Sequence, residues 1–428
     1  MLNRYTSQVT LFINYLLVIY AFLLPFNIHL SNTIFNFILI LFLFSGNLKE
    51  KLLYALKHKV VQALFLFYAM YFLWSFQSQH MHEVLWKLKE FKYLFYIIIF
   101  ITILRAEFKE KILNAFIVSV LISVLVSFAM QLEIHIPYIN ITGFGKLTPF
   151  FYTYSQYVLL VIISANIILY RMIKNRFTTL FYKNLHYLFF VLSTLLIFML
   201  DSKLGYILYL LSTSFIILRS FNNVSKKKAF LGLVIVFSLG YTIAFEMSST
   251  FHSRVSNLYN QTVDAFVHEK YDGSTGERFA WDMIGFKIFS KKPLLGYGTH
   301  EHIDLVVNYI NNSSMKPAEK KVLLRFTNPI TPWLQTLHNE YLDHLIQFGI
   351  VGLFILFNIF YSIYKEPTYS SELQILRFLL LIIFMLYMFV NYFFVLSQLG
   401  KVFFLLISLT LVSYEDYSQK QKGSLDAN

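Results

Sequence analysis

The stretch from Arg278 to Gly352 contains four short motifs, which read RFAW at 278–281, KPLLGYG at 292–298, HNEYL at 338–342 and GIVG at 349–352. It begins inside residues 246–332, the one long polar interval of an otherwise apolar chain. The remainder of the chain has the character of a frame embedded in a membrane. We therefore expect the chemistry of the protein where the polar interval meets that frame.

The composition indicates a membrane protein. Hydrophobic residues make up 57% of the 428 residues and charged residues only 14%, whereas a soluble domain is about a quarter charged. Apolar runs of about 20 residues recur along the chain, as in helices that cross a bilayer. These runs are continuous and lack the alternation of a membrane β-barrel. The sequence thus predicts an all-α polytopic membrane protein, and its lack of cysteine excludes disulfides and thiolate sites.

We expect about 12 transmembrane helices, with ends placed to within about four residues. They divide the chain into an N-terminal bundle of about nine spans at 1–245, the polar interval at 246–332, about three C-terminal spans at 333–414 and a tail at 415–428. The polar interval is expected to contain short helices. The expected spans cover 9–26, 29–45, 59–76, 91–105, 111–130, 151–171, 184–200, 204–219, 229–246, 343–364, 373–391 and 393–413.

The basic residues predict the orientation of the frame. Most of those outside the polar interval lie in alternate short loops, after the second, fourth, sixth and eighth expected spans. Basic loops stay in the cytoplasm, so we expect both termini there and residues 246–332 on the other side of the membrane. The net charge of +13 then reflects orientation, and no nucleic-acid partner is expected. The loop residues are Lys49, Lys51, Lys57, Lys59, Arg105, Lys109, Lys111, Arg171, Lys174, Arg176, Lys183, Arg219 and Lys226 to Lys228.

The polar interval is nearly neutral, because it contains ten basic and nine acidic residues. Within it, residues 278–289 have their apolar side chains on one helical face, which predicts a short amphipathic helix. Pro293 would end this helix, and Gly296 and Gly298 mark a turn. A single arginine on such a helix is usually solvated, so Arg278 alone indicates no function.

The order and spacing of the four motifs resemble those of the O-antigen ligase and polymerase superfamily. The likeness consists of an Arg with a Trp three residues later, a Pro-Leu-Leu-Gly-x-Gly turn, and His-Asn-x-x-Leu entering a span with Gly-x-x-Gly. A further match is Asp201-Ser202-Lys203-Leu204-Gly205-Tyr206, at the outer start of the 204–219 span. The family usually has Ser-Arg-Gly there, and Lys203 would keep an anion site without the bidentate geometry of arginine. Alternatively, Lys203 only extends to the membrane interface.

The resemblance implies a glycosyltransferase of the bacterial inner membrane that acts on the periplasmic side. Its donor would be a glycan on undecaprenyl diphosphate. The acceptor would be a lipid A–core sugar in a ligase, or another lipid-linked repeat unit in a polymerase. One long loop late in the chain favours the ligase, because the other outer loop, 131–150, is short. A transporter of lipid-linked glycans is a third alternative, although the spans contain few charges at mid-membrane.

The resemblance also assigns roles to individual residues. Arg278 and Lys203, with Arg325 as a third candidate, would stabilise the departing diphosphate. His338 would be the general base for the acceptor hydroxyl or, alternatively, a cation that binds the diphosphate. Glu340 could orient the site or simply favour the helix N-terminus. The supporting positions are Trp281, Asn339, Glu340, Gly296 and Gly298.

The segment His300-Glu301-His302 places two imidazoles around a carboxylate, as some metal sites do. No further ligand stands at a spacing typical of zinc. We therefore expect a solvated turn here and no metal site, and we expect the enzyme to use no cofactor.

Overall fold

The computed structural model describes residues 2–134, 147–150, 153–177, 179–200, 202–220, 226–326, 335–368 and 370–418. All regular elements in these ranges are helices, which confirms the all-α prediction. Asp201, most of the 131–150 loop, the last residues of the polar interval and the tail beyond Ser418 lie outside the described residues.

The helices follow the apolar runs of the sequence. The N-terminal part forms α1 (Leu2–Leu23), α2 (Ile28–Phe42), α3 (Leu48–Lys57), α4 (Lys59–Trp74), η1 (Ser75–Gln77), α5 (Met81–Glu90), η2 (Phe91–Phe95), α6 (Tyr96–Ile103), α7 (Ala106–Gln131), α8 (Tyr154–Ile173), α9 (Leu180–Met199), α10 (Lys203–Ser220) and α11 (Lys226–Met247). The polar interval forms α12 (Ser249–Val267), α13 (Gly273–Phe289), α14 (His302–Asn312), α15 (Pro317–Leu323) and η3 (Leu324–Phe326). The C-terminal part forms α16 (Glu340–Lys365), α17 (Ser371–Tyr387) and α18 (Ser397–Thr410).

Within the described residues, 7 helical segments are long and apolar enough to cross a membrane. Each overlaps one of the expected spans, so the chain is a membrane protein with several spans. The total of about 12 stays a prediction. The segments are Tyr5–Leu23, Lys59–Gln77, Ala106–Gln131, Tyr154–Ile173, Leu180–Met199, Glu340–Lys365 and Ser397–Ser418.

The segment 91–105 does not form the single spanning helix that its apolar run predicts. Its first residues form the 3-10 helix η2, and α6 then continues for only 8 residues. Alone, α6 extends about 12 Å, less than a hydrocarbon core of about 30 Å, but it continues directly from α5 and η2. Phe91 and Leu94 are fully buried, and η2 packs against α18. The run is therefore a buried part of the bundle, where a 3-10 segment divides the helical path between α5 and α6.

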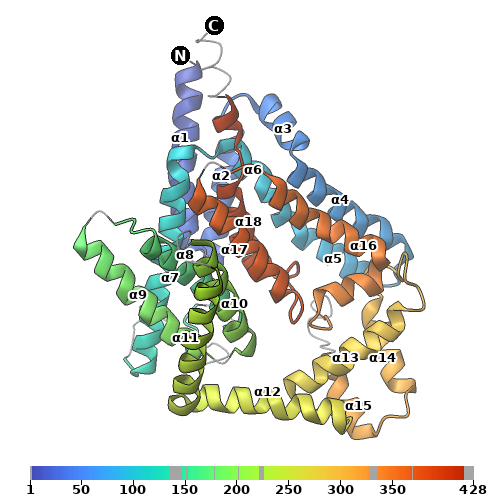
Figure 1. Cartoon of the computed structure of the whole chain (residues 1–428). Helices are drawn as coiled ribbons and strands as arrows, with labels where there is room; N and C mark the ends of the chain where they lie inside the picture. The colour runs from blue at the N-terminus through green and yellow to red at the C-terminus, as the bar shows by residue number, and fades with distance from the viewer. Residues whose placement is uncertain are drawn as a thin grey trace.

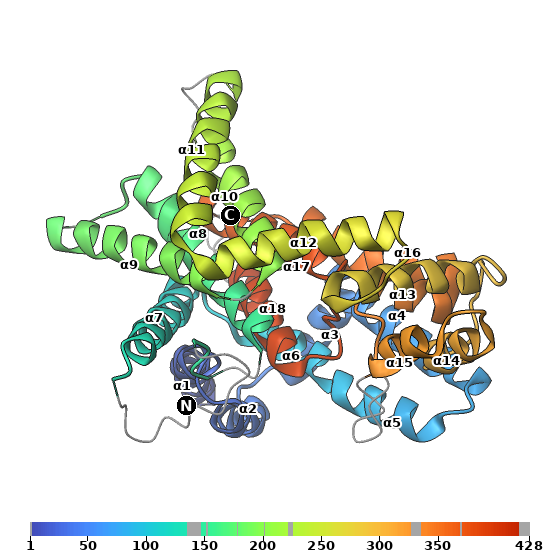
Figure 2. The ribbon, with the colours of Figure 1, turned by 90° about the horizontal axis from the view of Figure 1, so that it is seen from below.

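The helices form two groups on either side of α17 and α18 (Figure 1). One group consists of α8, α9, α10 and α11, and the other of α3, α4, α5 and α16. Helix α1 begins at one end of the molecule, and α12 to α15 lie at the opposite end. Viewed from that end, α12 runs from the foot of α11 to α13 (Figure 2). We call α12–α15, with the turn that joins α13 to α14, the arm.

The arm is joined to α16 by an exchange of backbone hydrogen bonds. Helix α16 is interrupted at Gly349 (φ 64°, ψ −161°), so two of its N–H groups and two of its carbonyls lose their helical partners. The turn after α13 supplies replacement partners for all four groups. The bonds run from Ile350 N to Pro293 O (2.8 Å), Val351 N to Leu294 O (3.3 Å), Tyr297 N to Ile346 O (3.0 Å) and Gly298 N to Gln347 O (2.9 Å).

Two glycines make this joint possible. Gly349 and Gly296 both have a positive φ, of 64° and 67°, a conformation that residues with a Cβ rarely adopt. A Cβ on Gly349 would meet the backbone of Leu294, and one on Gly296 would meet the backbone of Gln347. The KPLLGYG and GIVG motifs are therefore the two halves of one structural joint.

Candidate functional site

Helix α13 directs three side chains toward the start of α16. Arg278, Trp281 and Asp282 stand at positions i, i+3 and i+4, so they share one helical face. The ring of Trp281 stacks on that of His338, with the centroids 5.8 Å apart and an angle of 23° between the planes. The Trp281 indole N–H donates to the Leu323 carbonyl at 2.9 Å. The predicted amphipathic helix is confirmed, although it begins at Gly273.

His338 lies on the connector that precedes α16, with a left-handed backbone (φ 58°). Its ring contacts that of Trp281 and also that of Tyr392, whose centroid is 5.6 Å away. The Asn391 side chain lies close to the imidazole and acts to raise its pKa. Burial, followed by the charge of Arg278, lowers the pKa of His338 to about 4. The imidazole is therefore neutral near pH 7 and can accept a proton.

Asn339 connects the two helices of the site. Its side-chain oxygen accepts the Leu342 N–H at 3.2 Å and so caps α16. Its amide nitrogen donates to Asp282 Oδ1 at 3.0 Å. Burial raises the pKa of Asp282 to about 6, against the opposing effects of the Asn339 hydrogen bond and the Arg278 charge. Within the HNEYL motif, Asn339 thus joins α16 to α13 and positions the neighbouring His338.

Arg278 lies within electrostatic reach of both His338 and Lys203. Its Nε atom is buried and makes no hydrogen bond with the described residues. The Lys203 ammonium donates to Thr275 Oγ1 at 2.9 Å and to Gln261 Oε1 at 3.1 Å. These bonds hold Lys203 against the arm, instead of leaving it extended toward the interface. Both cations and the histidine of the sequence prediction therefore lie near one another.

Four other predicted site residues make their contacts with other groups. Arg325 is 65% exposed and forms an ion pair with Glu277 at 3.6 Å. Glu340 is buried, and its Oε2 accepts the Phe393 N–H at 2.6 Å. Its carboxylate therefore orients a connector, rather than acting only on the helix dipole. Gly296 and Gly298 belong to the joint with α16.

The prediction of a solvated turn at His300–His302 is wrong. His302 is 0% exposed and His300 is 4% exposed. His302 Nε2 lies 3.5 Å from Asp343 Oδ1, and the His300 N–H donates to the Gln347 side chain at 2.8 Å. The joint brings this segment beneath α16, which its sequence alone does not reveal. In the part of the chain that the structure describes, no group of three or more His, Asp or Glu is arranged to hold a metal ion.

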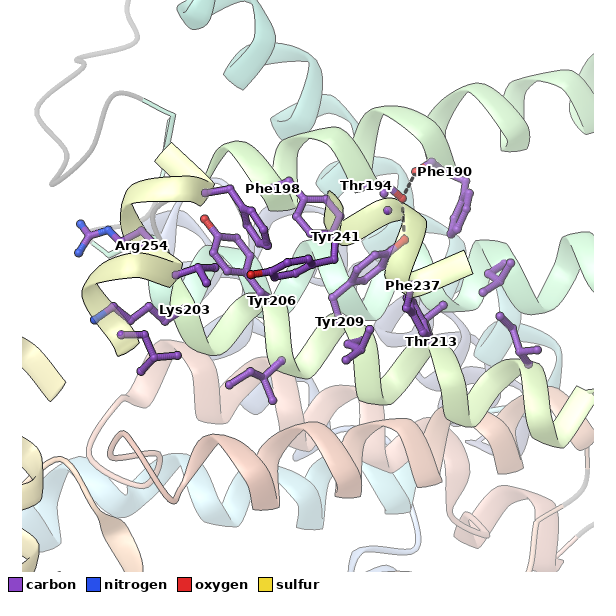
Figure 3. A pocket seen from close by; sticks show the side chains of 18 of the residues that line it. Phe190, Thr194, Phe198, Lys203, Tyr206, Tyr209, Thr213, Phe237, Tyr241 and Arg254 are labelled. Atoms are coloured by element: carbon purple, nitrogen blue, oxygen red, sulfur yellow. Dashed lines mark hydrogen bonds between the residues drawn. The ribbon is translucent and has the colours of Figure 1, made fainter. Parts of the chain in front are cut away.

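A cavity of about 830 Å³ lies beside Lys203, between α9, α10, α11 and α12. Lys203 and Arg254 stand at one end of it, and Phe190, Thr213 and Phe237 stand toward the other (Figure 3). Aromatic and aliphatic side chains form most of its wall, so the cavity is apolar with cations at one end. The lining residues are Leu169, Phe190, Thr194, Phe198, Lys203, Tyr206, Ile207, Tyr209, Leu210, Thr213, Ile217, Gly232, Phe237, Gly240, Tyr241, Phe251, Arg254, Val255 and Leu258.

Residues 188–357, from α9 to the middle of α16, match the family model described as O-Antigen ligase. Over these residues the chain is similar to the O-antigen ligase family. The resemblance inferred from the motifs is thereby confirmed, and the matched range contains Lys203, Arg278 and His338. This O-antigen ligase family comprises glycosyltransferase-like ligases and polymerases, which act on lipid-linked glycans and acceptors in membranes. No curated protein matches the chain.

Three residues around His338 were not predicted. Asp282 could have been found, because its i+4 position relative to Arg278 puts it on the same helical face. Asn391 and Tyr392 lie on the connector between α17 and α18, more than 50 positions from His338 in the chain. That connector lies outside the matched range, and no local spacing in the sequence links it to the site.

Proposed function

We propose that the chain is an O-antigen ligase-like glycosyltransferase. It would move a glycan from undecaprenyl diphosphate to a lipid A–core sugar on the periplasmic face of the bacterial inner membrane. The main support is the proximity of Arg278, Lys203 and His338, beside an apolar cavity and within the matched domain. Cations next to an apolar cavity suit a ligand that joins an anionic head to a long hydrocarbon chain.

The cavity between α9 and α12 is our candidate for the isoprenoid chain of the donor. Its aromatic walls, which include Tyr206 and Tyr241, offer apolar area to a hydrocarbon. Lys203 stands at the end of the cavity that the diphosphate would occupy. The ammonium would exchange its bonds to Thr275 and Gln261 for bonds to phosphate oxygens.

The two cations would stabilise the leaving group. When the acceptor oxygen bonds to the anomeric carbon, the bond from that carbon to the diphosphate oxygen breaks, and the electron pair leaves with the diphosphate. Arg278 and Lys203 would offset the charge that develops on it, in a site where burial strengthens electrostatic interactions. We expect these cations to suffice without a metal ion.

His338 would accept the proton that the acceptor hydroxyl loses. In the protein without donor, the Arg278 charge is one cause of the low pKa of His338. A diphosphate bound to Arg278 would offset that charge and raise the basicity of the imidazole. The base would therefore become effective when the donor is in place, and the proton would pass from the imidazole to bulk water after transfer.

The first prediction tests these roles in glycan transfer by purified protein. His338→Ala and Arg278→Ala should each lower the rate by about 100-fold or more, because each removes a base or a cation from the transition state. Lys203→Ala should also lose most activity, whereas Lys203→Arg should retain it. The assay uses a lipid diphosphate donor, with expression and membrane insertion measured in parallel. Lys291→Ala, an exposed cation of the arm, is the control and should remain active.

Near-normal turnover in both His338→Ala and Arg278→Ala would refute the site.

Transfer to a soluble acceptor would exclude a transporter without covalent chemistry. Analysis of the lipopolysaccharide from a deletion strain would distinguish a ligase from a polymerase. Loss of the glycan polymer, with a single repeat unit still attached to the core, would favour the polymerase.

A further inference from the structure

Two buried carboxylates in the first turn of α16 hold the connectors that meet at His338. Asp343 Oδ1 accepts the N–H of Leu337, the residue directly before His338, at 3.3 Å. Glu340 Oε2 accepts the N–H of Phe393 at 2.6 Å. The two side chains belong to residues that are 4% and 3% exposed, so these hydrogen bonds are shielded from competing water.

Both connectors determine where the imidazole of His338 lies. The first carries His338 itself, in a left-handed conformation (φ 58°) that persists only where neighbours hold it. Thr336 Oγ1 accepts the His338 N–H at 3.2 Å and supports the same conformation. The second connector carries Asn391 and Tyr392, which contact the imidazole. The two carboxylates therefore hold the backbone on both sides of the ring.

A buried lysine from a distant part of the chain balances these carboxylates. Glu340 and Asp343 stand three residues apart on one helical face, where two like charges repel. Lys87 of α5 is 3% exposed, and its Nζ lies 5.7 Å from the centroid of the Tyr71 ring. The Tyr71 hydroxyl lies 3.2 Å from His344 Nε2, and His344 Nδ1 lies 3.6 Å from Glu340 Oε1. Burial lowers the pKa of Lys87, and the charges of Asp343 and Glu340 act to raise it. A buried charge of either sign is stable only with such partners.

We propose that Lys87, Glu340 and Asp343 form a buried charge triad that positions His338. All three are buried and act on His338 through other groups, so they are positioning residues. The inference rests on the proposed function for the identity of the reaction that His338 serves. It extends the site to α5, a segment outside the matched range of 188–357.

The test measures how fast diethyl pyrocarbonate modifies His338 in the full-length purified protein, with the product read by mass spectrometry. In Asp343→Ala the Leu337 N–H loses its acceptor, and His338 should react about tenfold faster than in the wild type. Asp343→Asn keeps an oxygen for this bond and should react at the wild-type rate. Lys87→Met removes the positive charge that offsets the Glu340 and Asp343 carboxylates, and it should also accelerate the modification of His338. The exposed His29 serves as the internal reference.

Asp416→Ala is the matched control. Asp416 is also buried, accepts a backbone N–H, from Ser413 at 3.4 Å, and pairs with a lysine, Lys109, at 2.7 Å. Its loss should lower thermal stability and leave the reactivity of His338 unchanged. An unchanged rate in both Asp343→Ala and Lys87→Met would overturn the proposal, as would an equal rise in Asp416→Ala. If Asp343→Ala is not inserted into the membrane, the rate of His338 modification in Lys87→Met tests the proposal alone.

The transfer assay gives a second, kinetic readout. Asp343→Ala should lower kcat about 100-fold, since small misplacements of a catalytic group cost about this much. KM for the donor should change little, because Arg278 and Lys203 stay in place, and Asp343→Asn should restore most of the rate. A wild-type kcat in Asp343→Ala would overturn the triad. A wild-type protein without any transfer activity would overturn the proposed function instead, and the modification rates would still decide the role of the triad.

Discussion

At the scale of single residues, Asp282 is destabilising in the resting protein at neutral pH. Burial raises its pKa from 3.8 to about 6, despite the hydrogen bond from Asn339 and the charge of Arg278. A carboxyl group with a raised folded-state pKa contributes stability that is fully present below about pH 4 and is lost as the pH rises through about 6. At pH 8 the protein therefore holds a partly buried charge that its surroundings disfavour.

We predict that Asp282→Asn is more stable than the wild type at pH 8. The amide cannot ionise, and its oxygen can still accept the hydrogen bond from Asn339. The gain in melting temperature should shrink as the pH falls through about 6 and disappear near pH 4. Thermal unfolding in detergent, followed at several pH values, provides the measurement. A difference that does not vary with pH would show that the ionisation of Asp282 is not its cause.

The residues of the candidate site differ in how far they could be predicted. Arg278, Trp281 and His338 belong to short motifs whose order carries information, and the i, i+3 spacing already places the first two on one face. Lys203 was found although it departs from the usual arginine. Asp343 was missed although it accepts the Leu337 N–H from only six residues later. Tyr392 could not be found, because its relation to His338 depends on how connectors from distant helices meet. Such contacts are a property of packing, and no local spacing encodes them.

At the scale of elements, the joint between the arm and α16 depends on Gly349. A residue with a Cβ at this position would have to adopt an unfavourable positive φ of 64°. Its Cβ would also meet the Leu294 backbone. We predict that Gly349→Ala lowers the free energy of unfolding by about 1–3 kcal/mol and loosens the arm. The melting temperature and the rate of limited proteolysis in the arm measure both effects.

Gly232→Ala is the control for this substitution. Gly232 lies within α11, and a Cβ there would meet no atom within 4 Å. Alanine is favoured over glycine in a helix by about 1 kcal/mol, so stability should be unchanged or higher. Equal melting temperatures for Gly349→Ala and the wild type would mean that the joint adapts without cost.

Most helices could be predicted from the sequence, because long apolar runs have few alternatives in a membrane. The exception at 91–105 shows the limit of that argument. An apolar run looks the same in the sequence whether its side chains face lipid or are buried among other helices. Phe91 and Leu94 belong to the second kind, which only their packing against α18 reveals. The glycine joint was likewise predicted only as a turn, because its hydrogen-bond partners lie 49 to 57 residues later.

At the scale of the whole molecule, several basic residues that predict the orientation also connect helices. Lys109 at the start of α7 pairs with Asp416 at 2.7 Å, and Arg171 at the end of α8 pairs with Glu372 at 2.7 Å. The first pair ties the segment after α18 to the end of the molecule where α1 begins, opposite the arm (Figure 1). Cations that direct insertion thus also stabilise the end of the frame that we expect in the cytoplasm.

The last prediction concerns this orientation. The chain has no cysteine, so a single introduced cysteine can be labelled without background. Lys291 in the arm and Lys57 at the end of α3 are both exposed, which makes Lys291→Cys and Lys57→Cys a matched pair. A maleimide that cannot cross membranes should label Lys291→Cys in spheroplasts and Lys57→Cys only after lysis. The reverse pattern would place Arg278 and His338 on the cytoplasmic side, where the proposed lipopolysaccharide acceptor would not meet them.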